Sequence, residues 1–155
     1  MKEIKTKDRD PLTVASLLDV WEQSVRETHL FLSAEEIEEI KKYVPVALES
    51  VPSLIVEDDA AGTPIAFMGI DGTKLEMLFV SPKERGKGLG RKLLEFGISE
   101  YGIKELTVNE QNPQAKGFYE HMGFKAYKRS ELDEQGKPYP ILFMCRIERE
   151  AFGGK

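Results

Sequence analysis

The spacing of apolar residues near the start of the chain predicts helices. Five apolar residues lie at positions i, i+3, i+4, i+7 and i+11 of one helical face: Val14, Leu17, Leu18, Trp21 and Val25. That helix should begin near Pro11. Residues 33–36, Ser-Ala-Glu-Glu, have the form of a capping box, so we expect a second helix from Ser33 to about Glu49. It should be disturbed at Pro45, because proline lacks the amide hydrogen that a helix interior needs.

From residue 53 onward the pattern changes to short apolar runs separated by turn-forming residues. These runs predict strands at residues 53–57, 65–70, 75–80, 105–109, 124–129 and 141–147, after a weaker candidate at 2–6. A helix should span Gly88 to Tyr101. Asn112 should cap a further helix that ends at Met122-Gly123.

This order of elements predicts an α/β protein (α+β in its hairpin part) built on one mixed sheet. We expect six to seven strands and about four helices, lying on both faces of the sheet. Hairpins in the first half predict antiparallel pairing. Two strand–helix–strand crossovers in the second half predict parallel pairing. The length of 155 residues suits a single domain over residues 1–150, with residues 151–155 as a frayed C-terminal tail.

Composition and charge narrow the possible partners. The formal net charge is −5, which argues against nucleic acid as the main partner and is compatible with a cationic acceptor. No run approaches the about 20 apolar residues that span a bilayer, so we expect no membrane partner. The single cysteine, Cys145, lies in an apolar run and has no second cysteine to pair with. We therefore expect it to be buried, in a protein of the reducing cytoplasm.

The stretch ERGKGLGRKLLEF, at residues 84–96, joins a glycine-rich loop to an amphipathic helix. Loops of this kind commonly bind phosphate. A Walker A loop requires serine or threonine after Gly-Lys, but Gly88 follows here. A dinucleotide fingerprint requires a third glycine where this chain has Arg91. The pattern that remains is R-x-x-G-x-G, from Arg85 to Gly90. A plain glycine-rich turn into a helix is the structural alternative.

Glycine at positions 86, 88 and 90 would let backbone amides approach a pyrophosphate closely. The positive end of the following helix dipole would add to the attraction. Lys87, Arg91 and Lys92 can neutralise further phosphate charge.

Two ordered motifs resemble the signature of the GCN5-related N-acetyltransferases (GNAT family). The first is the apolar strand LEMLFVSP at residues 75–82, followed by RGKGLG at 85–90 and Leu93-Leu94. The second is VNEQNPQA at residues 108–115, followed by GFY at 117–119 and Gly123-Phe124. The segments WxxSVxxTHxFL at 21–32 and GKPYP at 136–140 resemble a subgroup of short bacterial members, the YjaB-like proteins.

This resemblance implies the GNAT fold and an acetyl-CoA-dependent N-acetyltransferase without a metal. It implies cofactor contacts from a group of backbone and side-chain positions: Leu78, Phe79, Val80, Arg85, Gly86, Lys87, Gly88, Leu89, Gly90, Arg91 and Asn112. Residues 78–80 would pair with the pantetheine arm beyond a bulge, and the Phe79 amide would stabilise an oxyanion. Asn112 has helix capping as its structural alternative.

The same resemblance implies direct attack of an amine on the thioester through a tetrahedral intermediate. Tyr119 matches the general acid that protonates the leaving thiolate. The base is Glu76 or His29, directly or through water. Glu76 has an exposed edge carboxylate as its structural alternative, and His29 a cap between the first two helices. An acyl-CoA-binding regulatory module without catalysis is the alternative function.

The acceptor would be a primary amine, on a protein lysine or a small molecule. The segment Leu106-Thr107-Val108-Asn109 lacks the glutamate that is common in enzymes acetylating protein N-termini. Candidates for the acceptor pocket are Trp21, Thr28, Phe31 and Leu32, with a place in the core as the alternative for Trp21. Tyr139 is a candidate for a pocket wall, with a rigid loop as its alternative. The sequence leaves open whether the protein is a monomer or a homodimer.

Overall fold

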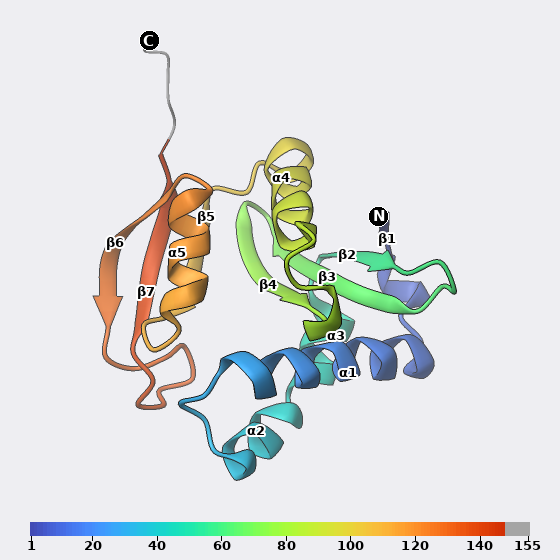
Figure 1. Ribbon diagram of the computed structural model, residues 1–155, viewed down its shortest axis with the longest axis horizontal. Coiled ribbons are helices and arrows are strands. Elements are labelled where there is room, and N and C mark those ends of the chain that lie inside the picture. The colour runs from blue at the N-terminus through green and yellow to red at the C-terminus, as the bar shows by residue number, and fades with distance from the viewer. Residues whose placement is uncertain (148–155) are drawn as a thin grey trace.

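Seven strands and five α-helices make up residues 1–147, the part of the chain that the computed structural model describes (Figure 1). Their bounds are β1 Lys2–Glu3, α1 Pro11–Thr28, α2 Ala34–Lys41, α3 Val44–Ser50, β2 Ser53–Asp58, β3 Pro64–Asp71, β4 Lys74–Val80, α4 Leu89–Tyr101, β5 Glu105–Asn109, α5 Pro113–His121, β6 Phe124–Ser130 and β7 Ile141–Arg146. Two 3-10 turns, η1 Thr6–Asp8 and η2 Pro82–Glu84, precede α1 and the glycine loop. The proposed tail at 151–155 lies outside the described residues.

The predicted helix starts are confirmed, but the second helix is divided. Ser33 and Glu36 form both halves of the capping box at the start of α2. This helix ends at Lys41 and a separate helix begins at Val44, where one continuous helix to about Glu49 was expected. The physical reason is Pro45, which is tolerated in the first turn of α3 but would remove a hydrogen bond from the interior of a continuous helix.

The sheet has the order β1-β2-β3-β4-β5-β7-β6, which confirms a mixed sheet but corrects its second half. Among the described strands only β4 and β5 pair in parallel, at Lys74–Glu105 and Leu75–Leu106. β7 lies between β5 and β6 and is antiparallel to both, so the second crossover joins strands that are not neighbours. β7, the second strand of the last hairpin, inserts between β5 and β6. No local sequence pattern predicts this pairing between distant segments.

A register shift in the β3–β4 pairing leaves one residue of β4 without a partner. Gly69 pairs with Met77 and Ile70 with Leu75, so Glu76 occupies a bulge. The extra residue changes which face each side chain takes. Leu75 and Leu78 pack in the core under α4, whereas Met77 packs in the core against α1–α3. The bulge is thus the point at which β4 bends away from β5 while it stays paired with β3 (Figure 1).

Helices cover both faces only in the first half of the sheet. In the second half α5 covers one face, where Leu106, Phe124 and Met144 are buried. Cys145, on the other face of β7, is exposed, so its predicted burial is wrong. An apolar run does not reveal that one face of a strand lacks a covering layer.

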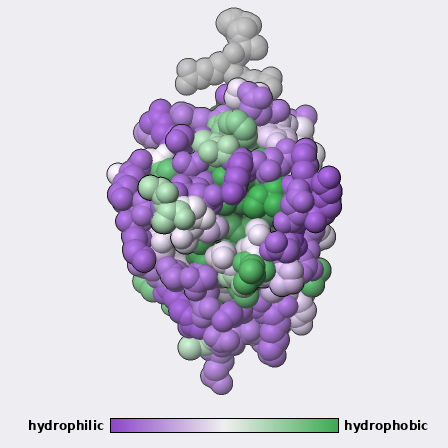
Figure 2. Space-filling model, turned by 90° about the vertical axis from the view of Figure 1, so that its right-hand side faces the viewer, coloured by the Kyte–Doolittle hydropathy of each residue, from purple (hydrophilic) through white to green (hydrophobic). Residues whose placement is uncertain are grey.

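The side of the molecule near the N-terminus is mostly hydrophilic at its margins, with hydrophobic residues visible near the middle of this face (Figure 2). Within residues 1–147 no helix is both long and apolar enough to cross a bilayer.

Candidate active site

Two cavities meet where β4 and β5 separate. Beyond Leu75–Leu106 the two strands no longer pair, and they diverge (Figure 1). One cavity, of about 320 Å³, lies along the glycine loop and is called here the loop cavity. The other, of about 430 Å³, lies between β4, β5, α3 and the β6–β7 loop and is called the second cavity. Six residues line both: His29, Leu78, Phe79, Asn112, Ala115 and Tyr119.

The glycine loop, residues 85–91, forms one wall of the loop cavity. Gly86 and Gly88 have positive φ angles of 78° and 77°, a conformation that other residues adopt with strain. Gly90 is helical and faces Phe118 instead, because a Cβ there would lie 3.6 Å from that ring. Among the described residues, no acceptor is found for the amides of residues 86–91. These amides at a helix start are therefore free to bind an anion.

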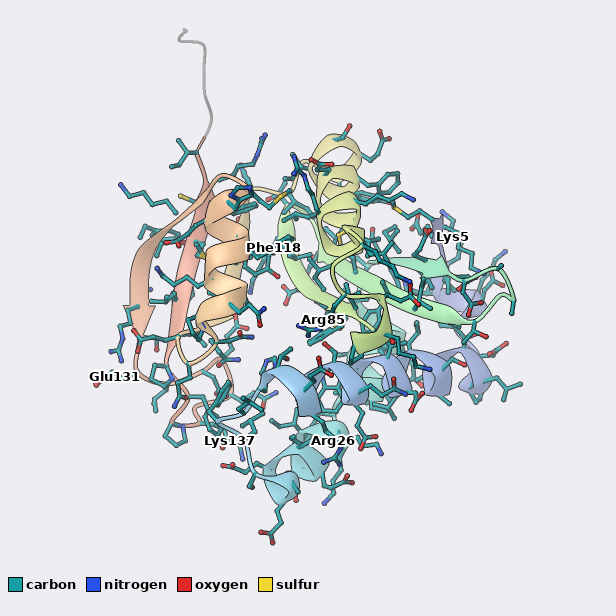
Figure 3. All side chains as sticks on the ribbon, in the orientation of Figure 1. Lys5, Arg26, Arg85, Phe118, Glu131 and Lys137 are labelled. Atoms are coloured by element: carbon teal, nitrogen blue, oxygen red, sulfur yellow. The ribbon has the colours of Figure 1, made fainter. Side chains whose placement is uncertain are left out.

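The basic side chains of the loop differ in where they point. Arg85 is directed toward the space between α5 and the end of α1, and its Nε lies 3.7 Å from Glu27 Oε1 (Figure 3). Arg91 lines the loop cavity and pairs with Glu95 at 3.0 Å. Lys87 pairs with Glu84 and is absent from the cavity wall, unlike every other predicted cofactor residue.

The register of β4 decides which of its peptide groups face the gap. The Ser81 amide donates to the carbonyl of Ile65, directly opposite, so residues 79 and 67 also form a hydrogen-bonded pair. The Phe79 amide therefore points toward β3, and its predicted role at an oxyanion is wrong. The peptide groups of Leu78 and Val80 point the other way, toward the open side of β4.

Tyr119 and Asn112 come from α5 to the junction of the two cavities. The Tyr119 ring packs edge-to-face against Phe118 and Phe124, and burial raises the pKa of its phenol above the usual value. Asn112 Oδ1 accepts the Ala115 amide at 3.2 Å, which confirms the helix cap. Its Nδ2 group remains available to the cavities, so capping and ligand contact are compatible.

His29 follows the last residue of α1 and lines both cavities. Its Nδ1 atom lies 2.8 Å from Thr28 Oγ1, and its ring packs against Phe31 at 5.4 Å between centroids. Burial, followed by the positive charge of Arg85, lowers the pKa of His29 to about 4. The imidazole is therefore neutral at pH 7.

Carboxylates line the second cavity. Glu76, from the bulge of β4, lies 3.5 Å from Lys74, and Glu134, from the β6–β7 loop, lies 2.8 Å from the same ammonium group. Asp133 also lines this cavity. The loop is anchored on its other side because the Tyr139 hydroxyl donates to Glu36 of α2. This contact raises the pKa of Tyr139 to about 12.

The structure thus brings the predicted residues together from five separate elements, with Lys87 at the periphery. The sequence motifs did not assign a role to Phe118, which lies beside Gly90, or to Thr28 as a partner of His29. They also missed Asp133 and Glu134, because the β6–β7 loop carries only turn-forming signals. Of the acceptor-pocket candidates, Trp21 is buried in the core and also lines the second cavity.

The chain is similar in sequence to a known protein family and to a curated relative. A family model described as "Acetyltransferase (GNAT) domain" matches residues 18–139. The peptidyl-lysine N-acetyltransferase YjaB of Escherichia coli strain K12 is 44% identical over 131 residues, which are 84% of this chain and 88% of that protein.

Solved structures agree with these sequence matches. The solution structure of apo-form YjaB from Escherichia coli superposes with a TM-score of 0.82 at 37% identity, covering 96% of this chain and 97% of that one. The PaiA N-acetyltransferase from Thermoplasma acidophilum, crystallised in complex with coenzyme A, shares the fold. Its TM-score is 0.63 at 23% identity, with 95% of this chain and all of that chain covered.

Proposed function

The chain belongs to the GCN5-related N-acetyltransferase (GNAT) family, and from this premise we propose that its acceptor is the amino group of a protein lysine. As a member of this family it is an acetyl-CoA-dependent N-acetyltransferase. The observation that carries the acceptor assignment is the pair of cavities joined at Tyr119, one beside the glycine loop and one lined by carboxylates. The name of the YjaB relative, a peptidyl-lysine N-acetyltransferase, supports the same acceptor class.

The glycine loop fits the pyrophosphate of coenzyme A. The free amides of residues 86–91 and the open space around Gly86 and Gly88 suit an anion that approaches the backbone closely. Arg85, directed into the loop cavity, supplies a positive charge for the same group. Lys87 adds charge only near the rim. When bound, acetyl-CoA supplies the thioester whose acetyl group is transferred.

Leu78 and Val80 offer peptide groups to the pantetheine arm, as an added strand would use them. Because the Leu78 amide points to the gap and lies beside both cavities, we assign it the role of donor to the developing oxyanion. One such donor typically lowers the activation free energy by about 3–4 kcal/mol. Phe79 contributes its ring to the wall, and Asn112 can donate through Nδ2.

Tyr119 acts as the acid. Its phenol is protonated at neutral pH, and burial raises its pKa further, so that it has a proton to donate to the sulfur of the leaving thiolate. A thiol has a pKa of about 8.5 in water, and the same dry surroundings raise the thiol's pKa too. The two pKa values therefore shift in the same direction, which keeps the proton transfer feasible.

The second cavity suits a cationic side chain. Carboxylates of Glu76, Asp133 and Glu134 favour an ammonium group over a neutral or acidic one. The amine must lose a proton before it can attack, since a lysine has a pKa of about 10.4. Among the titratable groups that line this cavity, Glu76 and His29 are the candidate bases for the proton that leaves the nitrogen as the uncharged amine attacks. Location in the cytoplasm and assembly as a monomer or homodimer stay predictions.

Thiol release from acetyl-CoA, with a peptide that carries one free lysine, tests this function. The wild-type protein should release thiol and acetylate the peptide. Tyr119→Phe should lower kcat by roughly 10²–10⁴-fold, as expected for loss of a general acid. Tyr127→Phe, at an exposed position on β6, is the matched control and should keep wild-type kcat.

Calorimetry with coenzyme A tests the glycine loop separately. Gly88→Ala should weaken binding at least tenfold, because a Cβ at positive φ strains the loop. Gly62→Ala, at φ 85° in the β2–β3 turn, introduces comparable strain away from both cavities and should leave affinity unchanged. Binding without transfer to any lysine peptide, and indifference to Tyr119→Phe, would instead favour the alternative of an acyl-CoA-binding regulatory module.

A further inference from the structure

The hydrogen bonds at the end of α1 determine which nitrogen of His29 carries the proton. A neutral imidazole has one N–H group and one nitrogen lone pair, and the partner of one nitrogen fixes the state of the other. Here Thr28 Oγ1 is the partner of Nδ1, at 2.8 Å.

The Thr28 hydroxyl has a single proton, and a backbone carbonyl already takes it. Thr28 Oγ1 lies 2.8 Å from the carbonyl oxygen of Ser24, which can only accept. The hydroxyl therefore donates to Ser24 and must accept at its second contact, from His29 Nδ1–H. A free histidine side chain in water favours the opposite tautomer, with the proton on Nε2. Thr28 thus holds His29 in the less common neutral form.

Backbone hydrogen bonds and ring packing hold His29 at the junction of the cavities. The His29 amide donates to Val25 at 2.8 Å, and its carbonyl accepts from Leu32 at 3.0 Å, so the backbone is fixed on both sides. Phe31 packs against the ring. Within residues 1–147, Nε2 has no hydrogen-bond partner, although the residue lines both cavities.

The groups around the His29 imidazole favour its neutral form. Arg85, from the end of η2, and Tyr119, from α5, line the loop cavity together with His29. Glu27, from α1, lies 3.7 Å from Arg85. Burial and Arg85 both act against a proton on the ring. Glu76, from β4, differs because its carboxylate is already held beside Lys74.

We propose that Thr28 is a positioning residue that fixes His29 as the Nδ1–H tautomer, so that Nε2 accepts the proton of the attacking lysine amine. This inference rests on the proposed function and assigns the base that it leaves open. The lysine ammonium first releases one proton to water, which leaves the uncharged amine that can attack. As the amine nitrogen bonds to the acetyl carbon, a second proton passes from that nitrogen to Nε2. The carbon–sulfur bond then breaks, and the thiolate takes a proton from Tyr119.

The tautomer can be measured directly, without acetyl-CoA or an acceptor. ¹⁵N NMR of the imidazole nitrogens should give Nδ1–H at pH 7 in the wild-type protein. Thr28→Ser keeps the hydroxyl and should keep this tautomer. Thr28→Val keeps the shape but lacks the hydroxyl, and His29 should revert to Nε2–H. A wild-type spectrum with Nε2–H would overturn the inference whatever the enzyme assay gives.

Kinetics with the single-lysine peptide test the consequence. Thr28→Val should lower kcat by about 10–100-fold, by analogy with the loss of a partner that orients a metal-ligating histidine. The KM for acetyl-CoA should stay within about twofold of wild type. Thr28→Ser should recover most of the loss. In a His29→Gln background Thr28→Val should have no further effect, because both changes act on the same proton transfer.

Three results would contradict the assignment of His29 as the base while leaving the proposed function intact. They are wild-type kcat for Thr28→Val, full additivity of Thr28→Val with His29→Gln, and a loss in Glu76→Gln as large as that in His29→Gln. By contrast, failure of the wild-type protein to bind coenzyme A would refute the proposed function, and the NMR measurement would still decide the tautomer.

Discussion

The pKa values of His29 and Tyr119 are shifted in opposite directions by the same physical cause. Burial disfavours the charged form of each group, which lowers the pKa of a histidine and raises that of a tyrosine. The result is a proton acceptor and a proton donor on opposite sides of one junction, from α1 and α5 respectively. Separation of their pKa values by the surroundings is a common feature of acid–base sites.

The lowered pKa of His29 predicts a pH-dependent stability. Between pH 6.5 and about 4 the unfolded chain binds a proton at this residue and the folded chain does not. The free energy of unfolding is therefore highest, with respect to this residue, above pH 6.5. It decreases as the pH falls below 6.5, and the decrease is complete once the pH has fallen through about 4. The contribution is on the order of 2–3 kcal/mol.

Urea unfolding at pH 7.5 and 4.5 measures this effect. His29→Gln should lose less stability than wild type between the two pH values, by about 2 kcal/mol. His121→Gln, at the exposed end of α5, is the control and should behave as wild type. Equal losses in all three proteins would contradict the assigned pKa.

At the scale of elements, β4 determines the site. The bulge at Glu76 ends its pairing with β5, changes the faces of the residues that follow, and turns alternate peptide groups toward the gap. Side chains of Met77 and Phe79 then contact the α1 side, while Leu78 and Val80 face α4. A single extra residue thereby creates both the gap and the backbone edge that borders it.

Hydrogen exchange can test this alternation. Without ligand, the amides of Leu78 and Val80 should exchange quickly, and the amide of Phe79, which donates to β3, slowly. Saturating coenzyme A should slow exchange at residues 78 and 80 by about tenfold or more and leave residue 79 unchanged. Protection of Phe79 alone on ligand binding would show that the pairing alternates in the opposite phase.

The whole molecule combines an acidic charge with a carboxylate-lined cavity. The net charge is −5, and Glu76, Asp133 and Glu134 gather where the acceptor enters. Long-range attraction of a basic substrate raises its rate of association and is screened by salt. The molecule should therefore favour lysines that are flanked by basic residues.

Peptides with matched flanks test this preference. We expect kcat/KM to be about 3–10-fold higher with basic than with acidic flanks at low salt, and the ratio to decrease at 0.3 M salt. Glu134→Gln should reduce the ratio. Glu100→Gln changes the net charge equally but lies on α4, away from the cavities, and should not. A ratio that is insensitive to salt would argue against steering.

Local patterns in the sequence were sufficient for most elements. Helical spacing located α1, the Ser33–Glu36 capping box located α2, and Asn112 located α5, because caps and periodicity act within a few residues. The two motifs also indicated the glycine loop and Tyr119. The split of the second helix was foreseen only as a disturbance, since Pro45 can either kink a helix or begin a new one.

The sequence by itself therefore determined the elements, the family and the residue types of the site. Tertiary structure alone decided that β7 enters between β5 and β6, that Cys145 faces outward, and that Leu78 rather than Phe79 faces the gap. It also placed His29 and Tyr119 at one junction, with Thr28 hydrogen-bonded to His29. These features depend on pairing and packing between segments far apart in the chain, and no short window of sequence contains both partners of such a contact.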